Sequence, residues 1–303
     1  MGPLGAGEKI VLEVTHQTSF RYSNAVSQSH NELRMSPIDT GLQQVLERHI
    51  LIDPAVAQRE HRDHFGNLVS RFNILEPHQQ LDITSTAKVE TTNAISCGPE
   101  SKPDPRPYRE RWIEFLDWSN GVPYLEEYGL IPLARELRMD MDEDEFSQAL
   151  SEMAGYFYRT FSYDPDVTHV YSTPKDFFAN GAGVCQDMAH ALIGVLRQAR
   201  IPARYVSGYI FDPPVGLEVG ESIRGSGATH AWVQAWHERF GWIGIDPTNN
   251  KLVDWQYIRT AVGRDYFDVQ PIRGVFQGAT EQRMTVAVQV AIAEFPASVS
   301  DTV

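Results

Sequence analysis

The sequence contains few cysteines, comparatively few basic residues and no long apolar run. Only two cysteines, Cys97 and Cys185, occur among its 303 residues. This excludes a disulfide framework and favours a reduced, cytoplasmic protein, with a single bridge between the two left open. No stretch approaches the roughly 18 apolar residues that a membrane-spanning helix needs. The first residues also lack the apolar core and cleavage site of a secretory signal. We therefore expect no membrane partner.

Acidic residues outnumber basic ones: 40 Asp and Glu stand against 26 Lys and Arg, for a formal net charge of −14. Because such a field repels phosphate groups, nucleic acids and anionic membranes are poor partners. His61 and His64 have the spacing of a metal-ligand pair, but no cysteine or second pair joins them in the sequence. We expect a solvated turn there, and neither a metal nor a cofactor.

Composition divides the chain into three segments. Residues 9–96 alternate between apolar and polar positions, with Gly, Asn and Pro between the runs, which is typical of a β-sandwich. Within them, residues 28–41 break the alternation and predict a loop with a helical turn. Residues 97–110 contain four prolines and predict a linker. Residues 111–303 form the third segment.

The third segment mixes helical and strand-like patterns. Residues 142–163 begin with acidic residues, which complement the dipole of a first helical turn, and then carry apolar residues at helical spacing. A second helix is predicted to begin near Cys185. Strand-like stretches follow it, at 203–211, 230–246 and 284–295. A helix followed by several strands predicts an α+β domain with the helix packed on an antiparallel sheet.

Cys185 stands at the predicted start of that second helix. Gly181 and Gly183 permit a tight turn before it, and Pro202 ends the helix. At a helix N-terminus the unpaired backbone amides and the dipole favour a thiolate and can stabilise an oxyanion. Cys185 is therefore a candidate nucleophile, although a buried, inert cysteine fits this stretch alone equally well.

A thiolate nucleophile needs a base, and two histidines compete for that role. His190 lies five residues along the same helix, about 140° from Cys185 around its axis, which favours a packing role. His230 begins an alternating strand just after a glycine-rich stretch and can face the helix start from the edge of the sheet. His237, seven residues further on, points to the opposite face of that strand. We therefore select His230 as the candidate base.

The base in turn needs a carboxylate or amide that orients its imidazole. Asp246 ends the next predicted strand, and residues 238–242 have the pattern of the hairpin turn between the two strands. Adjacent antiparallel strands can therefore place His230 and Asp246 side by side. An aspartate before Pro247 is also a common turn residue, so the case rests on Cys185, His230 and Asp246 together.

These motifs resemble the bacterial transglutaminase-like family, which has the papain-like cysteine protease fold. Residues 183–209 look like the family's nucleophile helix and the strand after it, and residues 229–250 look like its histidine and aspartate strands. Residues 263–278 resemble the loop that follows in this subgroup. Residues 161–178 resemble the approach to the nucleophile, and residues 9–90 resemble the family's N-terminal region. The likeness covers nearly the whole chain.

The resemblance implies an N-terminal β-sandwich followed by a transglutaminase-like catalytic core at 111–303. It places the nucleophile on Cys185, the base on His230 and the acid on Asp246. The implied reaction is attack of the thiolate on a carboxamide or peptide carbonyl, which leaves a thioester that water or an amine resolves.

The resemblance also suggests supporting residues and partners. Gln186 and Asp187 match the residues beside the family's nucleophile, and their backbone amides or the Gln186 side chain can line the site or serve the oxyanion hole. Tyr163 is a candidate donor to the same oxyanion, with a packed core tyrosine as its alternative. Residues 212–228, rich in Gly and Pro, predict a mobile flap over the site. The expected partner is a peptide or protein substrate, and neither calcium nor another cofactor is implied.

The triad alone leaves the outcome of the reaction open. We expect hydrolysis of a peptide or isopeptide amide ahead of transfer to an amine. Acyl transfer from a carrier-bound thioester and a non-catalytic binding scaffold are further alternatives.

Overall fold

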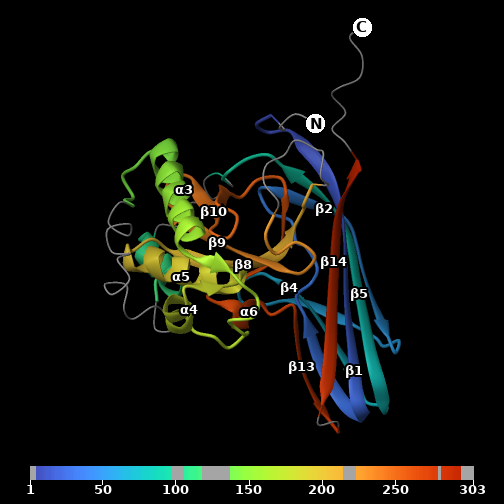
Figure 1. The fold of residues 1–303 in the computed structure, drawn as a ribbon. Coiled ribbons are helices and arrows are strands. Elements are labelled where there is room, and N and C mark those ends of the chain that lie inside the picture. Colours follow the sequence, from blue (N-terminus) through green and yellow to red (C-terminus); the bar gives the residue numbers. More distant parts are fainter. Residues whose placement is uncertain are drawn as a thin grey trace.

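The computed structural model describes residues 5–96, 98, 106–117, 137–213, 223–278 and 281–294. The fold is α+β, as predicted, with mostly antiparallel strands and few helices. The helices gather on one side of the molecule and the longest strands form the other side (Figure 1). Within the described ranges, a seven-stranded and a five-stranded sheet contain nearly all of the strands.

The strands of the seven-stranded sheet are β1 (Lys9–Leu33), β2 (Gln43–Asp53), β3 (Arg59–Arg62), β4 (Leu68–Ile74), β5 (His78–Thr92), β13 (Ile272–Gln277) and β14 (Gln282–Glu294). The five-stranded sheet consists of β8 (Ala203–Ile210), β9 (His230–His237), β10 (Gly241–Asp246), β11 (Lys251–Leu252) and β12 (Tyr257–Gly263). A short pair is formed by β6 (Ser162–Tyr163) and β7 (Ala182–Gly183). The helices are α1 (Tyr108–Arg111), the 3₁₀ helix η1 (Ile113–Phe115), α3 (Glu143–Thr160), α4 (Pro174–Asn180), α5 (Cys185–Gln198) and α6 (Tyr266–Val269).

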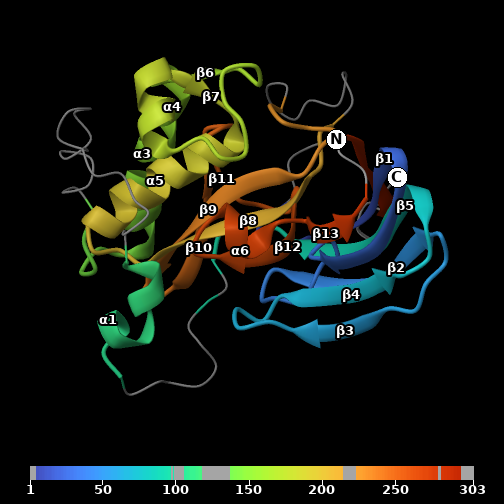
Figure 2. The same ribbon diagram turned by 90° about the horizontal axis from the view of Figure 1, so that it is seen from below.

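The long strand β1 organises the N-terminal part. Its first half pairs with β5 and β14, and its second half pairs with β4 and β13. The sheet therefore curls on itself, with β1 passing through both halves (Figure 2). The two halves enclose an apolar cluster that includes Phe20, Leu33 and Phe72. They pack as the two layers of the predicted sandwich would, but they share one continuous strand.

The prediction of a loop at 28–41 is wrong for its first part. Strand β1 continues to Leu33 through an irregularity, at which Gln28 adopts a φ of 49°. Such an irregularity bends a strand and lets it enter a second set of pairings. Two of the polar residues that break the sequence pattern are bonded to each other, since Asn31 Nδ2 donates to Ser29 Oγ over 2.9 Å.

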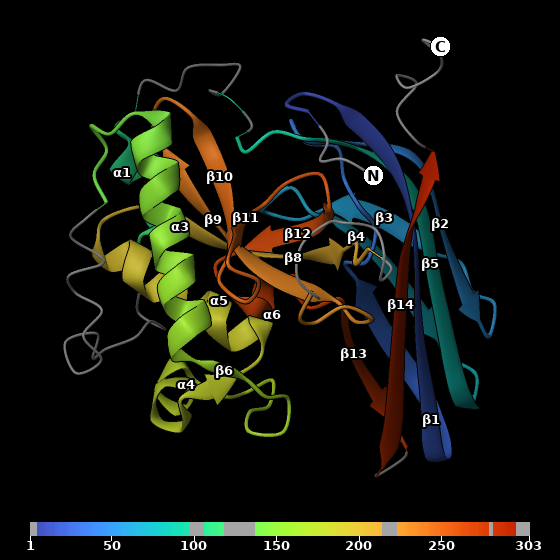
Figure 3. The same ribbon diagram turned by 45° about the horizontal axis from the view of Figure 1, so that its top comes forward.

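The last two strands depart from the predicted domain boundaries. That division placed all of residues 111–303 in the second domain, but β13 and β14 pair with β1. Val288 and Val290 of β14 pack against the apolar cluster between the two sheets. Alternation predicts a strand but does not show which of two sheets it joins. The chain therefore returns from the second domain to the first (Figure 3).

The five-stranded sheet, in the order β11-β10-β9-β8-β12, supports the predicted helices. Helix α5 packs across β8 and β9, and α3 packs against β10 and β11. Leu192 of α5 and Val233 of β9 are buried in the shared core. The helix predicted at 142–163 is α3, and its N-cap Asp142 accepts from the Glu145 amide over 2.9 Å. The predicted helix packed on an antiparallel sheet is confirmed.

Two amide side chains from the N-terminal part complete the outer edge of β12. Gln43 donates to the Arg259 carbonyl over 2.9 Å and accepts from its amide over 2.8 Å. Asn67 bonds the Val262 carbonyl and amide in the same way, over 2.8 and 2.7 Å. Because an edge strand presents unpaired backbone groups, these side chains continue the sheet and join the two parts of the molecule.

A buried histidine also lies between the two parts. His16 of β1 has Nδ1 3.0 Å from the Tyr209 hydroxyl of β8 and Nε2 3.1 Å from Thr18 Oγ1. Tyr209 donates to the Met35 carbonyl over 2.8 Å, so its oxygen accepts from the Nδ1–H of His16. Burial lowers the pKa of His16 to about 4, and the folded protein therefore keeps this ring neutral at pH 5.

We expect the free energy of unfolding to fall as the pH drops from 7 to 5. The unfolded chain protonates His16 below pH 6.5, whereas the folded protein does so only near pH 4, so protons favour the unfolded state in this window. The loss from His16 amounts to about 2 kcal/mol at pH 5. Urea titrations compare the wild type with His16→Asn, which keeps a donor toward Tyr209. The variant should show the weaker pH dependence, and an equal dependence contradicts this account.

Two predictions fall partly on residues outside those described: the linker at residues 97 and 99–105, including Cys97, and the flap at residues 214–222. The described end of the linker differs from the prediction, because α1 already begins at Tyr108. In the described part of the chain, no helix is long and apolar enough to cross a membrane.

Candidate active site

Helix α5 begins at Cys185, so the candidate nucleophile is its first residue. Val184 before it is extended, and its amide donates to Asp187 Oδ2 over 2.9 Å. A Cβ at Gly183 would lie 2.7 Å from the same carboxylate oxygen, so only glycine fits this entry turn. The turn and the carboxylate together fix where the helix starts, and they leave Cys185 among the unpaired amides of the first turn.

The two residues after Cys185 hold the loop that precedes α4. Gln186 Nε2 donates to the Val170 carbonyl over 3.1 Å, and Asp187 Oδ2 accepts from Thr168 Oγ1 over 2.7 Å. Burial raises the pKa of the Asp187 carboxyl, against the hydrogen bonds that it accepts. Because both side chains serve this loop, the predicted contribution of Gln186 and Asp187 to an oxyanion hole rests on their backbone amides.

The hairpin of β9 and β10 brings together the other two residues of the predicted triad. His230 is the first residue of β9 and Asp246 is the last residue of β10. His230 Nε2 lies 2.7 Å from Asp246 Oδ2, and neither side chain has accessible surface. The imidazole is therefore held by the carboxylate in a site closed to solvent.

The electrostatics of the pair favour a protonated imidazole. Burial alone lowers the pKa of His230, but the charge and hydrogen bond of Asp246 and the interaction with Cys185 raise it to about 10. Burial alone would raise the pKa of Asp246, but its contacts with His230 and two other side chains lower it. Since Nε2 is bonded to Asp246, Nδ1 is the ring nitrogen left for Cys185, and it has no other hydrogen-bond partner among the described residues. This order of groups is what an activated thiol needs.

Two further side chains hold Asp246, and neither was predicted from the sequence. Asn249 Nδ2 and the Tyr257 hydroxyl each donate to Asp246 Oδ2 over 2.8 Å, and the Thr248 amide donates to Oδ1 over 2.8 Å. Asn249 lies three residues after Asp246, a spacing at which an aspartate often bonds its own turn, so a local signal existed. Tyr257 comes from β12, and nothing local connects it with Asp246.

We expect Tyr257→Phe to destabilise the protein by about 1–2 kcal/mol, because it removes one donor from a buried carboxylate. Chemical denaturation measures the change in the free energy of unfolding. Tyr22→Phe, on the distant curled sheet, is the matched control. A Tyr257→Phe midpoint equal to that of the wild type would mean that the remaining donors suffice.

Tyr163 was predicted as a donor to the oxyanion, and its hydroxyl lies near His230. It belongs to β6, which pairs with β7 directly before the nucleophile helix. Burial, with the negative charges of Cys185 and Asp246, raises the pKa of Tyr163 and keeps its hydroxyl protonated. A Cβ at Gly225 would lie 3.0 Å from His230 Nδ1 and 3.4 Å from the Tyr163 hydroxyl. The hydroxyl therefore lies beside the imidazole edge that faces the thiol, while its catalytic role stays a prediction.

The histidines that were set aside lie elsewhere. His190 Nε2 accepts from the Tyr266 amide over 3.1 Å, and His237 is fully buried. His64 Nε2 lies 2.9 Å from a carboxylate oxygen of Glu114 instead of forming a ligand pair with His61. Within the described ranges, no group of three or more His, Cys, Asp or Glu side chains is placed to hold a metal ion.

Two family descriptions match this chain. "Bacterial transglutaminase-like N-terminal region" matches residues 12–90, and "Transglutaminase-like superfamily" matches residues 132–247. The second range includes Cys185, His230 and Asp246. An uncharacterized protein of Mycobacterium tuberculosis is 33% identical over 297 residues, which cover 88% of each chain. The chain belongs to the bacterial transglutaminase-like family.

This transglutaminase-like chain also resembles one more distant relative in sequence and one solved structure. A protein-glutamine gamma-glutamyltransferase of Pseudomonas aeruginosa is 29% identical over 153 residues, which cover 49% of this chain and 21% of that protein. The crystal structure of a candidate cysteine protease from Cytophaga hutchinsonii matches with a TM-score of 0.68 and 21% identity, covering 95% of this chain and 92% of the other. That likeness supports the fold alone, and the predicted papain-like architecture is confirmed.

Proposed function

We propose that this transglutaminase-like protein is an enzyme that breaks a peptide or isopeptide amide bond through a thioester on Cys185 and passes the acyl group to water. One observation carries the proposal. Cys185 at the start of α5 lies near enough to His230 to raise the pKa of this fully buried imidazole, whose Nε2 is 2.7 Å from Asp246 Oδ2. A thiol, a base and a carboxylate in this order can perform acyl transfer without any further group.

The mechanism follows from the placement of the protons. The Cys185 thiolate attacks the amide carbonyl, and the oxyanion that forms lies within reach of the amides at the start of α5 and of the Tyr163 hydroxyl. His230 Nδ1–H gives its proton to the leaving amine, the carbon–nitrogen bond breaks, and a thioester remains. Water then attacks the thioester, His230 Nδ1 takes up its proton, and the carboxylic acid leaves with the thiolate restored.

Hydrolysis is the favoured outcome because Cys185, unlike the buried His230 and Asp246, is partly exposed. Water can therefore reach a thioester formed on its sulfur. An open acyl-enzyme is hydrolysed unless its surroundings exclude water until an amine arrives.

Transfer to an amine is the second candidate, and the burial of the base favours it. The His230 side chain has no accessible surface, so the group that must activate the second nucleophile is shielded from bulk water. An amine substrate with binding energy of its own could reach Nδ1 where free water is held back. The Pseudomonas relative is named as an enzyme of this transfer type.

The deciding experiment offers both acceptors at once. The protein is incubated with glutamine-containing peptides and a labelled primary amine, and the products are identified by mass spectrometry. Cleaved peptides or deamidated glutamine support hydrolysis, and amine adducts support transfer. If no thioester and no product form with any peptide, the binding-scaffold alternative gains and the proposed activity is wrong. A cytoplasmic location and the lack of nucleic acid partners stay predictions.

We expect Tyr163→Phe to lower kcat roughly 10- to 100-fold with little change in KM, because an oxyanion donor acts in the transition state and not in substrate binding. Steady-state kinetics with the best substrate of the peptide assay measure both constants. Tyr156→Phe, on helix α3, is the matched control. A loss confined to KM would place Tyr163 in substrate binding instead.

A further inference from the structure

A cavity of about 530 Å³ lies beside α5, on a different face of the helix from the one that meets His230. Its α5 wall is a single stripe that includes His190, Ile193 and Arg197, and the segments at 171–175 and 264–267 line its other sides. Cavities that bind ligands in proteins span roughly 300–1,000 Å³. The volume therefore suits a small molecule or two to three residues of a peptide.

The mouth of the cavity carries two exposed aromatic rings. Tyr171 and Phe267 keep 71% and 50% of their surface exposed, and their rings stack at 6.2 Å with an interplanar angle of 26°. Val167 and Val170, on the same loop as Tyr171, are also exposed. Aromatic side chains grouped at a surface are typical of binding sites, because they offer a large contact area at a low cost in entropy.

This apolar mouth is connected directly to the nucleophile helix. The Val170 carbonyl, one residue before Tyr171, accepts from Gln186, one residue after Cys185. From Cys185 to His190 the helix rises by about 7.5 Å and turns by about 140°. Because the path around the helix is longer than the rise, an extended peptide covers it in roughly four residues at about 3.3 Å each. A peptide whose carbonyl lies at the thiol can therefore place a side chain a few residues away in the cavity.

The floor of the cavity presents a neutral hydrogen-bond donor. Burial lowers the pKa of His190 to about 4, with a smaller contribution from Arg197. Its Nε2 accepts from the Tyr266 amide over 3.1 Å, so the single proton of the neutral ring lies on Nδ1. Arg197 donates to the carbonyls of Asp117, Ala203 and Arg264 and so joins three walls.

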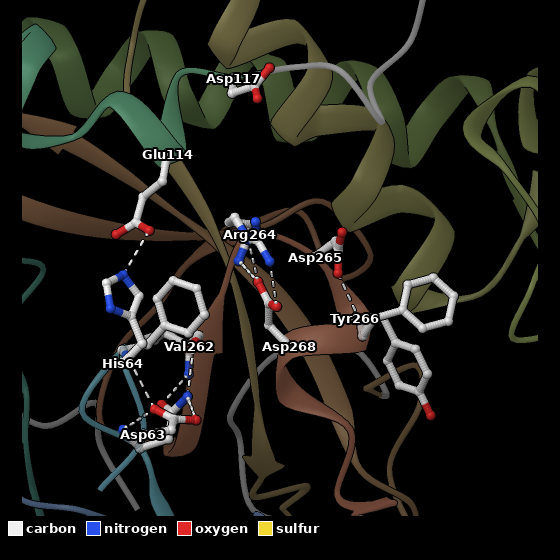
Figure 4. A network of polar contacts seen from close by, with 12 residues as sticks. Asp63, His64, Glu114, Asp117, Val262, Arg264, Asp265, Tyr266 and Asp268 are labelled. Carbon is white, nitrogen blue, oxygen red and sulfur yellow. Dashed lines mark hydrogen bonds and ion pairs between the residues drawn. The ribbon is translucent and has the colours of Figure 1, made fainter.

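Charged groups at the edge of the cavity are held by partners. Arg264 forms a two-bond pair with Asp268, over 2.9 and 3.0 Å, and Glu114 bonds His64 over 2.9 Å (Figure 4). Asp117, Lys175 and Asp265 also line the cavity, so it combines apolar surface with charges of both signs in place of a strong charge of one sign.

We propose that this cavity is a specificity subsite, which binds an aromatic or large aliphatic side chain of the acyl-donor peptide against the stacked rings of Tyr171 and Phe267 and donates a hydrogen bond from His190 Nδ1 to a peptide carbonyl. The proposal deepens the proposed function, because it names the class of peptide that reaches Cys185. A peptide side chain bound there would cover both exposed rings.

The test uses N-acetylated hexapeptide amides with one fixed glutamine, in which each other position in turn is Phe, Leu or Gly. We expect one position at which Phe and Leu are preferred over Gly. At that position Tyr171→Ser and Phe267→Ser should lower kcat/KM about tenfold for the Phe peptide and leave the Gly peptide unchanged. Leu51→Ser, an equally exposed apolar residue of the curled sheet (69% exposed), is the matched control. A preference that both variants retain overturns the subsite.

A binding measurement separates the failure of the subsite from the failure of the proposed activity. Dye-labelled Phe and Gly peptides are titrated with Cys185→Ala, alone and combined with Tyr171→Ser, and fluorescence anisotropy is recorded. Tighter binding of the Phe peptide that is lost in the double variant supports the subsite even if the wild type turns over no peptide. Equal binding of the two peptides overturns it even if the enzyme is active.

Discussion

Cys185→Ala should lower the turnover of any amide substrate by at least about 10³-fold and should abolish the thioester adduct, because no other atom in the site can carry the acyl group. The removal of one sulfur atom from a partly exposed position leaves the fold intact. The measurement is the rate of product formation, together with intact-protein mass spectrometry after rapid acid quenching. The wild type should show a mass increase equal to the acyl group, and the variant should show none.

The other cysteine of the sequence, Cys97, provides the control for this experiment. Cys97→Ala also removes one thiol, and its activity should equal that of the wild type. Iodoacetamide should inactivate the wild type and the Cys97 variant at the same rate. Activity that survives in Cys185→Ala would exclude the thioester mechanism, and equal losses in the two variants would point to a role for both thiols.

Asp246→Asn should lower kcat/KM roughly 10²- to 10⁴-fold while the protein stays folded. The carboxylate is the main group that raises the pKa of the buried His230 to about 10, against the effect of burial. A neutral amide cannot supply that charge, so burial then dominates and the pKa of His230 falls. The imidazole loses its proton at neutral pH, and it can no longer hold a thiolate or protonate the leaving amine.

The pH profile tests this explanation separately from the size of the loss. In the wild type His230 stays protonated up to a pH of about 10, and in Asp246→Asn the alkaline limb of kcat/KM should move to lower pH. Asp254→Asn is the matched control, because Asp254 also lies near the end of this sheet but pairs with Lys251 over 2.9 Å at a partly exposed position. A profile of Asp246→Asn with the wild-type alkaline limb would show that the carboxylate acts only on structure.

The features predicted correctly depend on neighbours within a few residues of each other. The start of α5 follows from the glycines before Cys185 and from Asp187, which bonds the amide three residues before it. The hairpin that joins His230 to Asp246 follows from two alternating runs and the short turn between them. The acidic first turn of α3 likewise marked a helix that is capped by its own residues. Short-range patterns of this kind can be read directly, since the groups that interact are close in the chain.

The features that the sequence did not reveal depend on residues that are distant in the chain. Strand β14 lies in the same sheet as β1, some 270 residues away, and alternation is the same for a strand in either sheet. Tyr257 reaches Asp246 from another strand, and Gln43 completes the edge of β12 from the opposite part of the molecule. Packing alone selects these partners.

The proposed function likewise rests partly on local sequence patterns and partly on contacts between distant residues. The sequence by itself determined which residues the proposed chemistry would use, because a helix start at Cys185, a histidine strand and an aspartate strand each have a local pattern. Only the tertiary structure decided what surrounds that chemistry: the burial of His230, the donors to Asp246, and the cavity between Tyr171, Phe267 and His190. Burial and cavities arise where separate elements meet, and no local pattern records which elements those are.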